Sequence, residues 1–298
     1  MQAITRFAPS PTGLLHVGNA YAALCCESWA KLHGATMLLR IEDIDHTRCQ
    51  PPFSEAILTD LNWLGLIWQQ PVRKQSAHLA EYQQAIDRLR HMGVIYPCFC
   101  TRKAIANELA RMGVAPHADD NTPPYPGTCR HLPEPEQTER MQQEPFAWRL
   151  DVGKAAALIG GLPGWHDTDN RLHPASIPHD VVIGRKDIAY SYHLAVVVDD
   201  AAQGVTHIIR GEDLQGSTGI HRLLQALLGF PEPVYMHHRL LKTPTGERLA
   251  KRIGSTTLRS LRDMGVNPER LRRYLLQEER HLWPFMDSDE AAIVAELG

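Results

Sequence analysis

The sequence predicts an α/β protein: a parallel sheet that carries an inserted subdomain, followed by a C-terminal segment that is mainly helical. Short apolar runs alternate with longer helical patterns through the first third of the 298 residues, which is typical of βαβ units. Prolines and glycines then gather in residues 101–178, and the alternation returns after them. After Pro244 the chain is basic and has helical patterns.

The first strand and helix are the best-defined pair. An apolar run at residues 4–8 leads through a turn rich in proline and glycine into a helical pattern at residues 17–33, which Gly34 ends. A helix that begins in this way offers free backbone N–H groups and the positive end of its dipole to a phosphate. His16 adds a donor there, and Gly18 leaves room for a flat ring to approach the backbone.

The other elements follow in order along the chain. Before the insertion we expect a strand at 35–41, a helix at 51–66, a strand at 71–75, a helix at 76–92 capped by Ser76, and a new element from Tyr96. After the insertion the alternation resumes at residues 180–185. The nearly continuous apolar run at residues 194–200 predicts a strand buried on both faces, followed by a strand at 205–210 and a helix at 218–228.

The composition is that of an ordinary globular protein, with 43% hydrophobic and 22% charged residues. No apolar run reaches the length of a membrane span, and the N-terminus lacks a signal-peptide pattern, so we expect a cytoplasmic protein. Six cysteines in a reducing compartment do not suggest disulfides, and the closely spaced Cys98 and Cys100 suit a metal. Cys25 and Cys26 lie in the first helical pattern and are expected to be packing residues.

Charge is distributed unevenly along the chain. The formal net charge is −3, yet residues 239–280 hold eleven lysines and arginines against five acidic residues. Such a basic stripe is expected of a protein that binds a polyanion such as a nucleic acid. A solvated helical face explains the same charges equally well.

Residues 6–19, Arg-Phe-Ala-Pro-Ser-Pro-Thr-Gly-Leu-Leu-His-Val-Gly-Asn, resemble the first signature of the class I aminoacyl-tRNA synthetases, in the form of the glutamyl and glutaminyl branch. The resemblance implies a Rossmann-like catalytic domain in two halves, at residues 1–100 and 179–240. It also implies an inserted zinc-binding, acceptor-like subdomain at 101–178. A helical segment at 241–298 would carry a second signature with a lysine loop.

That lysine loop is identified by resemblance. Residues 248–252, Arg-Leu-Ala-Lys-Arg, resemble the second class I signature, Lys-Met-Ser-Lys-Ser, with Lys251 at the catalytic lysine position. Arg248 replaces the first lysine and Ala250 the serine, so one hydrogen bond to phosphate is lost while the charge remains. The resemblance implies that ATP, accompanied by Mg²⁺, binds to His16, Gly18, Asn19 and Lys251. His16, Asn19 and Lys251 would then stabilise charge on the phosphates during catalysis.

The resemblance also implies a site for L-glutamate. The implied binding residues are Arg6, Ala8, Ser10, Glu42, Tyr192 and Arg210. Arg6 would face the side-chain carboxylate, because a planar guanidinium suits a bidentate carboxylate, and Glu42 would hold the α-ammonium group. Val196 stands where glutamyl-tRNA synthetases generally have asparagine, so one polar contact to the amino acid is missing.

The cysteines suggest a structural zinc site. Cys98, Cys100 and Cys129 would supply three thiolates, and a closed tetrahedral site needs a fourth ligand. Coordination chemistry alone favours His131, because Cys129-x-His131 is a common kind of pair. A family of short paralogues of glutamyl-tRNA synthetase, which this chain resembles, instead implies Tyr125, through its Tyr-x-x-x-Cys spacing. Three unligated cysteines are the remaining alternative.

The whole chain resembles a family of short paralogues of glutamyl-tRNA synthetase. Ordinary glutamyl-tRNA synthetases continue into a helical domain that reads the anticodon, whereas this sequence ends at Gly298. The family activates glutamate with ATP in the absence of tRNA and transfers it to queuosine at the wobble position of tRNA(Asp). Two alternatives are a truncated synthetase that charges the tRNA 3′ end and a non-catalytic regulator that binds tRNA or glutamate.

Overall fold

The computed structural model describes residues 2–111, 124–186, 190–242, 256–277, 293 and 296–297. Its N-terminal part alternates strands and helices: β1 (Ile4–Phe7), α1 (Val17–Leu32), β2 (Thr36–Ile41), α2 (Pro51–Trp63), β3 (Gln69–Lys74) and α3 (Leu79–His91). The three strands pair in parallel in the order β1-β2-β3. Gly34 takes a φ of 58° directly after α1, as the sequence predicts for a helix stop.

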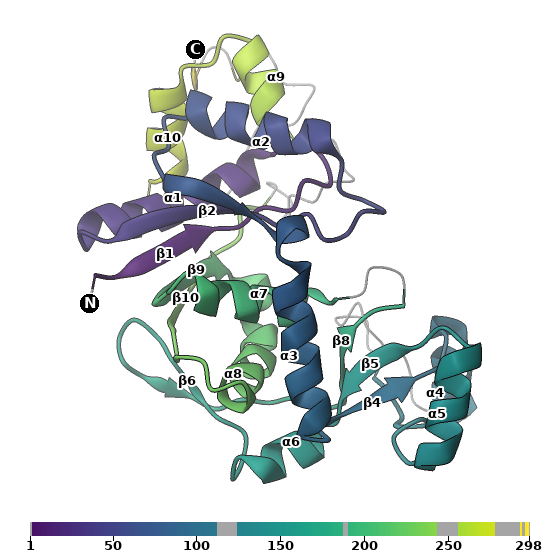
Figure 1. Ribbon diagram of the computed structural model, residues 1–298. Coiled ribbons are helices and arrows are strands. Elements are labelled where there is room, and N and C mark those ends of the chain that lie inside the picture. Colours follow the sequence, from purple (N-terminus) through teal and green to yellow (C-terminus); the bar gives the residue numbers. More distant parts are fainter. Residues whose placement is uncertain are drawn as a thin grey trace.

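The second half of the parallel sheet comes from late in the chain: α7 (Tyr192–Ala202), β9 (His207–Gly211), α8 (Thr218–Leu227) and β10 (Val234–His238). β9 and β10 pair in parallel. Thr206, just before β9, donates its backbone N–H to the carbonyl of Ile4 in β1 at 3.0 Å. The strands therefore line up as β3-β2-β1-β9-β10 (Figure 1). Successive strands are added on one side of β1 before the insertion and on the other side after it, so the strand order reverses beside β1.

The middle of the chain forms a separate antiparallel sheet at one side of the molecule (Figure 1). This stretch of the chain contains β4 (Ile95–Cys98), α4 (Arg102–Arg111), α5 (Glu134–Gln143), β5 (Ala147–Leu150), α6 (Val152–Leu158) and β8 (Val181–Gly184). The strand order is β4-β5-β8, and a small hairpin of β6 (Trp165–His166) and β7 (Leu172–His173) stands apart from it. The expected resumption of the parallel alternation at residues 180–185 is wrong, because β8 pairs antiparallel with β5.

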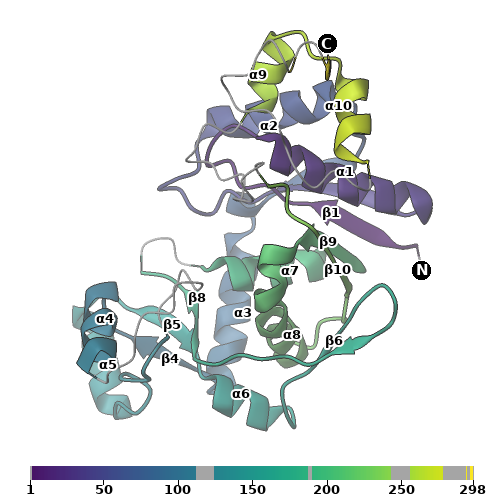
Figure 2. The same cartoon turned by 180° about the vertical axis from the view of Figure 1, so that it is seen from behind.

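Two short helices, α9 (Leu258–Asp263) and α10 (Pro268–Leu275), pack against the N-terminal half of the parallel sheet. Figure 2 shows them from behind, beside α1 and α2. Arg262 in α9 pairs with Asp60 in α2 at 2.7 Å, and Arg272 in α10 pairs with Glu27 in α1. Part of the basic stripe therefore pairs with acidic residues of α1 and α2 and holds α9 and α10 against these two helices.

The prediction of a strand at residues 194–200 is wrong, because this run forms most of helix α7. Ser191 caps the helix through its hydroxyl, which accepts the N–H of Leu194 at 3.4 Å. The apolar residues 194–198 are all buried, in a core shared with α3 and α8. A helix buried on most sides has the same continuous apolar run as a buried strand, so periodicity does not separate the two.

The prediction that Ser76 caps the third helix is also wrong. A 3₁₀ turn occupies Gln75–Ala77, and α3 begins at Leu79 with His78 at the N-cap. Ser76 instead donates its backbone N–H and its hydroxyl to Asp43, at 2.8 and 2.7 Å. A tertiary contact across the sheet edge takes the place of the local cap.

Within the described residues, no helix combines the length and the apolar character needed to span a membrane.

Candidate active site

A cavity of about 320 Å³ opens at the carboxyl ends of β1 and β9. It is lined by Arg6, Phe7, Ala8, Ser10, Ala22, Cys26, Glu42, Tyr192, Ile209, Arg210, Gly211 and Leu214. All six residues named from the sequence for glutamate line it. In open parallel sheets, ligands bind beyond the carboxyl ends of the strands where the strand order reverses, and the cavity lies at that place.

The β1 wall of the cavity is charged and internally compensated. Buried Arg6 donates from Nε and Nη2 to the two carboxylate oxygens of Asp200, at 2.8 and 3.3 Å. Arg40, fully buried, donates to Asp200 at 2.7 Å and to Glu42 at 3.1 Å. Burial alone would raise the pKa of Asp200, but the two arginines hold it below its ordinary value.

A second acid supports the same wall from behind. Buried Asp199 accepts hydrogen bonds from Arg73, Gln75 and Tyr82 at 2.7, 2.7 and 2.8 Å. Arg73 also pairs with Glu81 in α3. This network joins β2, β3, α3 and α7 and leaves Arg40 enclosed between Asp199 and Asp200.

Glu42 supplies the acidic group that faces the cavity. It follows β2, and its backbone N–H donates to the carbonyl of Pro9 at 3.0 Å, which ties it to the loop after β1. Burial raises the pKa of Glu42 despite the opposing effect of Arg40 and Arg6. An ammonium group in the cavity would favour the ionised carboxylate, because an opposite charge at short range offsets the cost of burial.

The β9 wall is built differently. Buried Arg210 donates Nε to His237 at 3.2 Å, Nη1 to His221 at 2.9 Å and Nη2 to Thr218 at 2.7 Å. None of these partners is an acid. Tyr192, at the first turn of α7, packs edge-on against the ring of His221 with centroids 5.6 Å apart.

The first signature forms the N-terminus of α1. His16 is the N-cap: its Nδ1 accepts the N–H of Gly18 at 3.0 Å, and Asn19 Oδ1 accepts the N–H of His16 at 3.1 Å. A Cβ at residue 18 would lie 2.8 Å from the His16 ring and would displace it from its capping position. The flat ring that approaches Gly18 in this structure is thus the imidazole of His16.

Lys251, with the rest of the loop at 248–252, lies outside the described residues. The chain that follows it is placed against the first signature. Val17 donates its N–H to the carbonyl of Thr256 at 3.2 Å, and Leu258 donates to Leu15 at 2.8 Å. Residues 256–258 therefore lie against the first signature.

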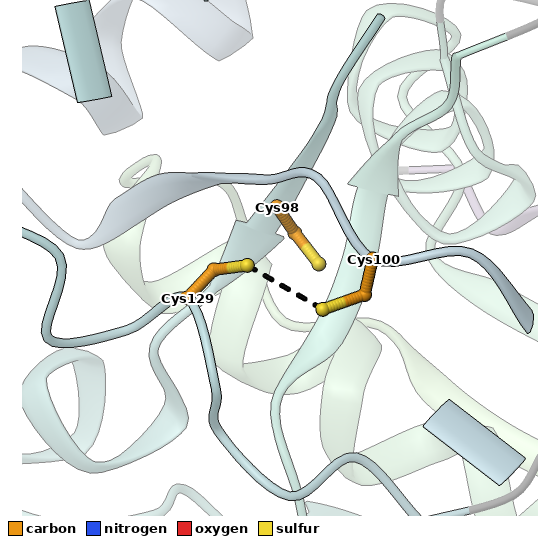
Figure 3. A group of neighbouring side chains, drawn as sticks. All are labelled: Cys98, Cys100 and Cys129. Carbon is orange, nitrogen blue, oxygen red and sulfur yellow. Dashed lines mark hydrogen bonds between the residues drawn. The ribbon is translucent and has the colours of Figure 1, made fainter. Parts of the chain in front are cut away.

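The sulfur atoms of Cys98, Cys100 and Cys129 lie within 4.8 Å of one another (Figure 3). The hydroxyl of buried Tyr125 is 3.5 Å from Cys98 Sγ and 3.9 Å from Cys100 Sγ. His131 is exposed and does not belong to this group. The arrangement suits a small tetrahedral cation with thiolate ligands, and it favours Tyr125 over His131 as the fourth ligand.

The guanidinium of Arg149 lies beside the three cysteines. Arg149 donates Nε to Cys98 Sγ at 3.3 Å, and its guanidinium lies 3.7 Å from the ring centroid of Tyr125. Hydrogen bonds from Cys129, Tyr125 and Arg149 lower the pKa of Cys98 to about 4. Arg149 would partly offset the negative charge of several thiolates around one metal ion.

Comparison with known proteins now identifies the family. The family described as tRNA synthetases class I (E and Q), catalytic domain, matches residues 2–290. A protein of Rhodobacter capsulatus named glutamyl-Q tRNA(Asp) synthetase is 42% identical over 280 residues, covering 91% of this chain and 99% of that protein. The chain belongs to the glutamyl-Q tRNA(Asp) synthetase family. Membership makes it a ligase-type enzyme of the class I aminoacyl-tRNA synthetase kind, a class that uses ATP with Mg²⁺.

Other comparisons agree with this family. The protein of the same name from Nitratidesulfovibrio vulgaris is 41% identical, with 91% of this chain and 84% of that protein covered. The glutamate-tRNA synthetase of Elizabethkingia anophelis has the same fold, with a TM-score of 0.73 at 24% identity. That match covers 99% of this chain and 65% of the Elizabethkingia chain.

Sequence reasoning missed several residues that shape this member of the glutamyl-Q tRNA(Asp) synthetase family. Asp200 and Arg40 hold Arg6, and His221, His237 and Thr218 hold Arg210. A usable signal was the pair of acids that ends the apolar run at 194–200, because unpaired carboxylates are rarely buried. Val196, expected to remove a polar contact, is buried in the apolar core around α7 and does not line the cavity.

Proposed function

We propose that this chain activates L-glutamate with ATP in the absence of tRNA, and then transfers the glutamyl group to queuosine in tRNA(Asp). The observation that carries the proposal is the cavity, which brings together Arg6, Glu42 and Arg210 next to the first signature. Two cations and one acid match a ligand with two carboxylates and one ammonium group. An amino acid with an apolar side chain would leave one of the buried arginines without a ligand group.

Activation joins the amino acid to the α-phosphorus of ATP. An oxygen of the α-carboxylate attacks phosphorus, the bond to the bridging oxygen breaks, and pyrophosphate leaves. The N-terminus of α1 offers its dipole to the phosphates, and Asn19 stands in its first turn. His16 accepts a hydrogen bond on Nδ1, so the neutral ring carries its proton on Nε2 and donates from there.

Lys251 and Mg²⁺ complete this proposal. Lys251 would bring positive charge to the leaving phosphates. The carbonyl of Thr256, which the structure does describe, accepts the N–H of Val17 in the first turn of α1. Mg²⁺ bound to the triphosphate supplies further charge for the leaving pyrophosphate. The chain's own contribution is orientation and preorganised charge, since no protein nucleophile is needed.

Transfer would follow on the modified base. A hydroxyl of the queuosine diol attacks the carbonyl carbon of the adenylate, an ester forms, and AMP leaves. The choice of queuosine is supported by the names of the relatives.

The test of activation is glutamate-dependent exchange of pyrophosphate into ATP without tRNA. We expect exchange by the wild-type chain and a loss of at least about a hundredfold in Lys251→Ala, the size of effect seen when one charge-stabilising donor is removed. Lys103→Ala, which removes an exposed lysine of α4, is the matched control. Unchanged exchange in Lys251→Ala would remove this residue from the role.

The test of transfer uses labelled glutamate and tRNA from cells with and without queuosine. Attachment only to tRNA(Asp) that carries queuosine is expected. Attachment to the terminal ribose would support a truncated glutamyl-tRNA synthetase, and no attachment would support a regulator that binds tRNA or glutamate. The base-lability of the product distinguishes these results.

We also propose that the inserted subdomain, assigned to residues 101–178, holds a structural Zn²⁺ through Cys98, Cys100, Cys129 and Tyr125. The convergence of three sulfurs and a buried phenol oxygen supports it. Cys98 ends β4 and Cys100 follows it, whereas Tyr125 and Cys129 come from the insertion, so the metal would link the insertion to the chain that enters it.

Metal analysis of the purified protein tests the zinc site, with near-stoichiometric Zn²⁺ expected. Cys129→Ser should lose the metal, whereas Cys25→Ser, which changes a cysteine of α1, should keep it. Tyr125→Phe should weaken zinc retention against a chelator and His131→Ala should not. The reverse order would make His131 the fourth ligand.

A further inference from the structure

Arg210 is a buried cation whose neighbours are all uncharged. Its side chain is almost fully enclosed, and each guanidinium nitrogen donates to His237, His221 or Thr218. In the part of the chain that the structure describes, no carboxylate pairs with it. Arg6, across the same cavity, is bound by both oxygens of Asp200. We name the three partners, together with His193, the Arg210 cradle.

The hydrogen bonds fix the protonation of the cradle. A guanidinium only donates, so His221 Nδ1 must be a bare acceptor and its proton lies on Nε2. His221 Nε2 is 3.1 Å from His193 Nδ1, which must therefore accept. The two hydrogen bonds therefore run in one direction, from Arg210 to His221 and from His221 to His193, and both imidazole rings are neutral.

The other side of the guanidinium obeys the same logic. His237 Nε2 accepts from Arg210 Nε at 3.2 Å, so the proton of that ring lies on Nδ1. Thr218 Oγ1 accepts from Nη2 and is 3.3 Å from His237 Nε2, to which its hydroxyl donates. Burial and the charge of Arg210 lower the pKa of His193 to about 4 and of His237 to about 3, and place that of His221 well below its ordinary value.

A buried cation without a counter-ion is costly, and the usual partner in proteins is a carboxylate. Here the cradle accepts one hydrogen bond from each guanidinium nitrogen, three of the five N–H groups, while adding no negative charge. The charge of Arg210 therefore stays available to the cavity that it lines. A carboxylate that enters the cavity meets a cation already oriented and not yet neutralised.

We propose that the Arg210 cradle is a specificity device: its neutral acceptors position Arg210 and keep its charge uncompensated, so that a substrate carboxylate becomes its counter-ion. His221 is the central positioning residue, because it joins Arg210 to His193. This inference rests on the proposed function, in which the ligand is glutamate. It adds that binding of a glutamate carboxylate by Arg210 depends on residues that do not line the cavity.

The decisive variant is His221→Glu, which places a carboxylate where the cradle has a neutral acceptor. We expect the KM for glutamate in pyrophosphate exchange to rise about 30-fold or more, because the new acid competes with the substrate for Arg210. The same substitution at His91, an exposed histidine of α3, adds the same charge far from the cavity and should change KM less than about threefold. His221→Gln keeps a neutral acceptor and should restore most of the affinity.

Binding of glutamate and of its two monoamides, glutamine and isoglutamine, shows whether charge is the cause. In His221→Glu the penalty should be large for glutamate and small for the monoamide that lacks the carboxylate held by Arg210. Equal penalties for all three ligands would mean general damage to the pocket and would overturn the proposal. Thermal unfolding is measured beside binding, and a folded His221→Glu protein is expected because the new acid pairs with Arg210.

A second variant covers the case in which His221→Glu does not fold. Thr218→Val removes one neutral acceptor with little change of shape and should raise the KM for glutamate about tenfold or more, corresponding to the loss of one hydrogen bond to a charged group. Thr218→Ser should rescue it. If the wild type forms no glutamyl adenylate, the proposed function fails. If it does, and these variants keep the wild-type KM, the cradle alone is wrong.

Discussion

The two walls of the cavity hold their arginines in opposite ways. On the β1 wall, Arg6 is bound by Asp200, which also binds Arg40. On the β9 wall, Arg210 is bound by histidines and a threonine. On the first wall a protein carboxylate already offsets the charge of the arginine, whereas on the second each guanidinium nitrogen has an acceptor but none of these acceptors carries a negative charge. Burial of an arginine therefore does not by itself show whether its charge is offset by the protein or is available to a ligand.

The largest effect is expected from breaking the β1 wall. Asp200→Asn would leave Arg6 and Arg40 buried with one fewer negative charge, and removing one partner of a buried ion pair costs about 3–5 kcal/mol. We expect a loss of that order in the free energy of unfolding, measured by urea denaturation. Asp87→Asn, an exposed acid of α3, is the control and should change stability by less than about 0.5 kcal/mol. A stable Asp200→Asn protein would contradict the contrast between the walls.

Arg210→Gln should separate stability from binding on the β9 wall. Removing an uncompensated cation should change the free energy of unfolding by no more than about 1 kcal/mol, because the amide still bonds to the cradle. The KM for glutamate should rise about a hundredfold or more, as expected when a charged partner of a ligand is lost. Urea denaturation and pyrophosphate exchange on one preparation measure both. A large loss of stability would show that Arg210 supports the fold as Arg6 does.

The smallest effect is expected from pH, and it sharpens the same comparison. Histidines whose pKa is lowered by burial bind fewer protons when folded than when unfolded, so stability falls as pH drops below about 6.5. Between pH 7.5 and 5.5 we expect a loss of about 1 kcal/mol for each of His193 and His221. Asp200 has a lowered pKa, so its contribution is lost only below its ordinary value of 3.8.

Urea denaturation across this range, with His193→Gln as the comparison, checks the prediction. That variant should show a shallower loss between pH 7.5 and 5.5, because it lacks one of the histidines whose pKa is lowered in the folded state. Equal pH dependence in the wild type and the variant would mean that His193 is not buried in the neutral form.

Much of the fold follows from local patterns. The apolar run before residue 8, the helix from Val17 and its end at Gly34 were predictable because each depends on neighbours in sequence. Residues 194–200 were predicted as a strand and form a helix, because a segment buried on most sides loses the periodicity that distinguishes the two. The antiparallel place of β8 depends on its partner β5, which local sequence does not reveal.

The site divides in a similar way. The six residues named for glutamate came from a resemblance in motifs. The structure places all six in the lining of one cavity, and their roles toward glutamate remain a prediction. The residues behind them were not found. Asp200 lies 194 positions from Arg6 in sequence, and His221 belongs to a helix whose pattern looks like ordinary amphipathic packing.

The sequence by itself determined the chemistry available to this protein: a helix N-terminus after a glycine-bearing turn, a set of arginines and acids, and closely spaced cysteines. It could do so because those features are local or recur as motifs. Only the tertiary structure decided which arginine is neutralised and which is left with its charge. That outcome depends on which groups approach within hydrogen-bond distance in a buried place, and such distances are set by the packing of distant segments.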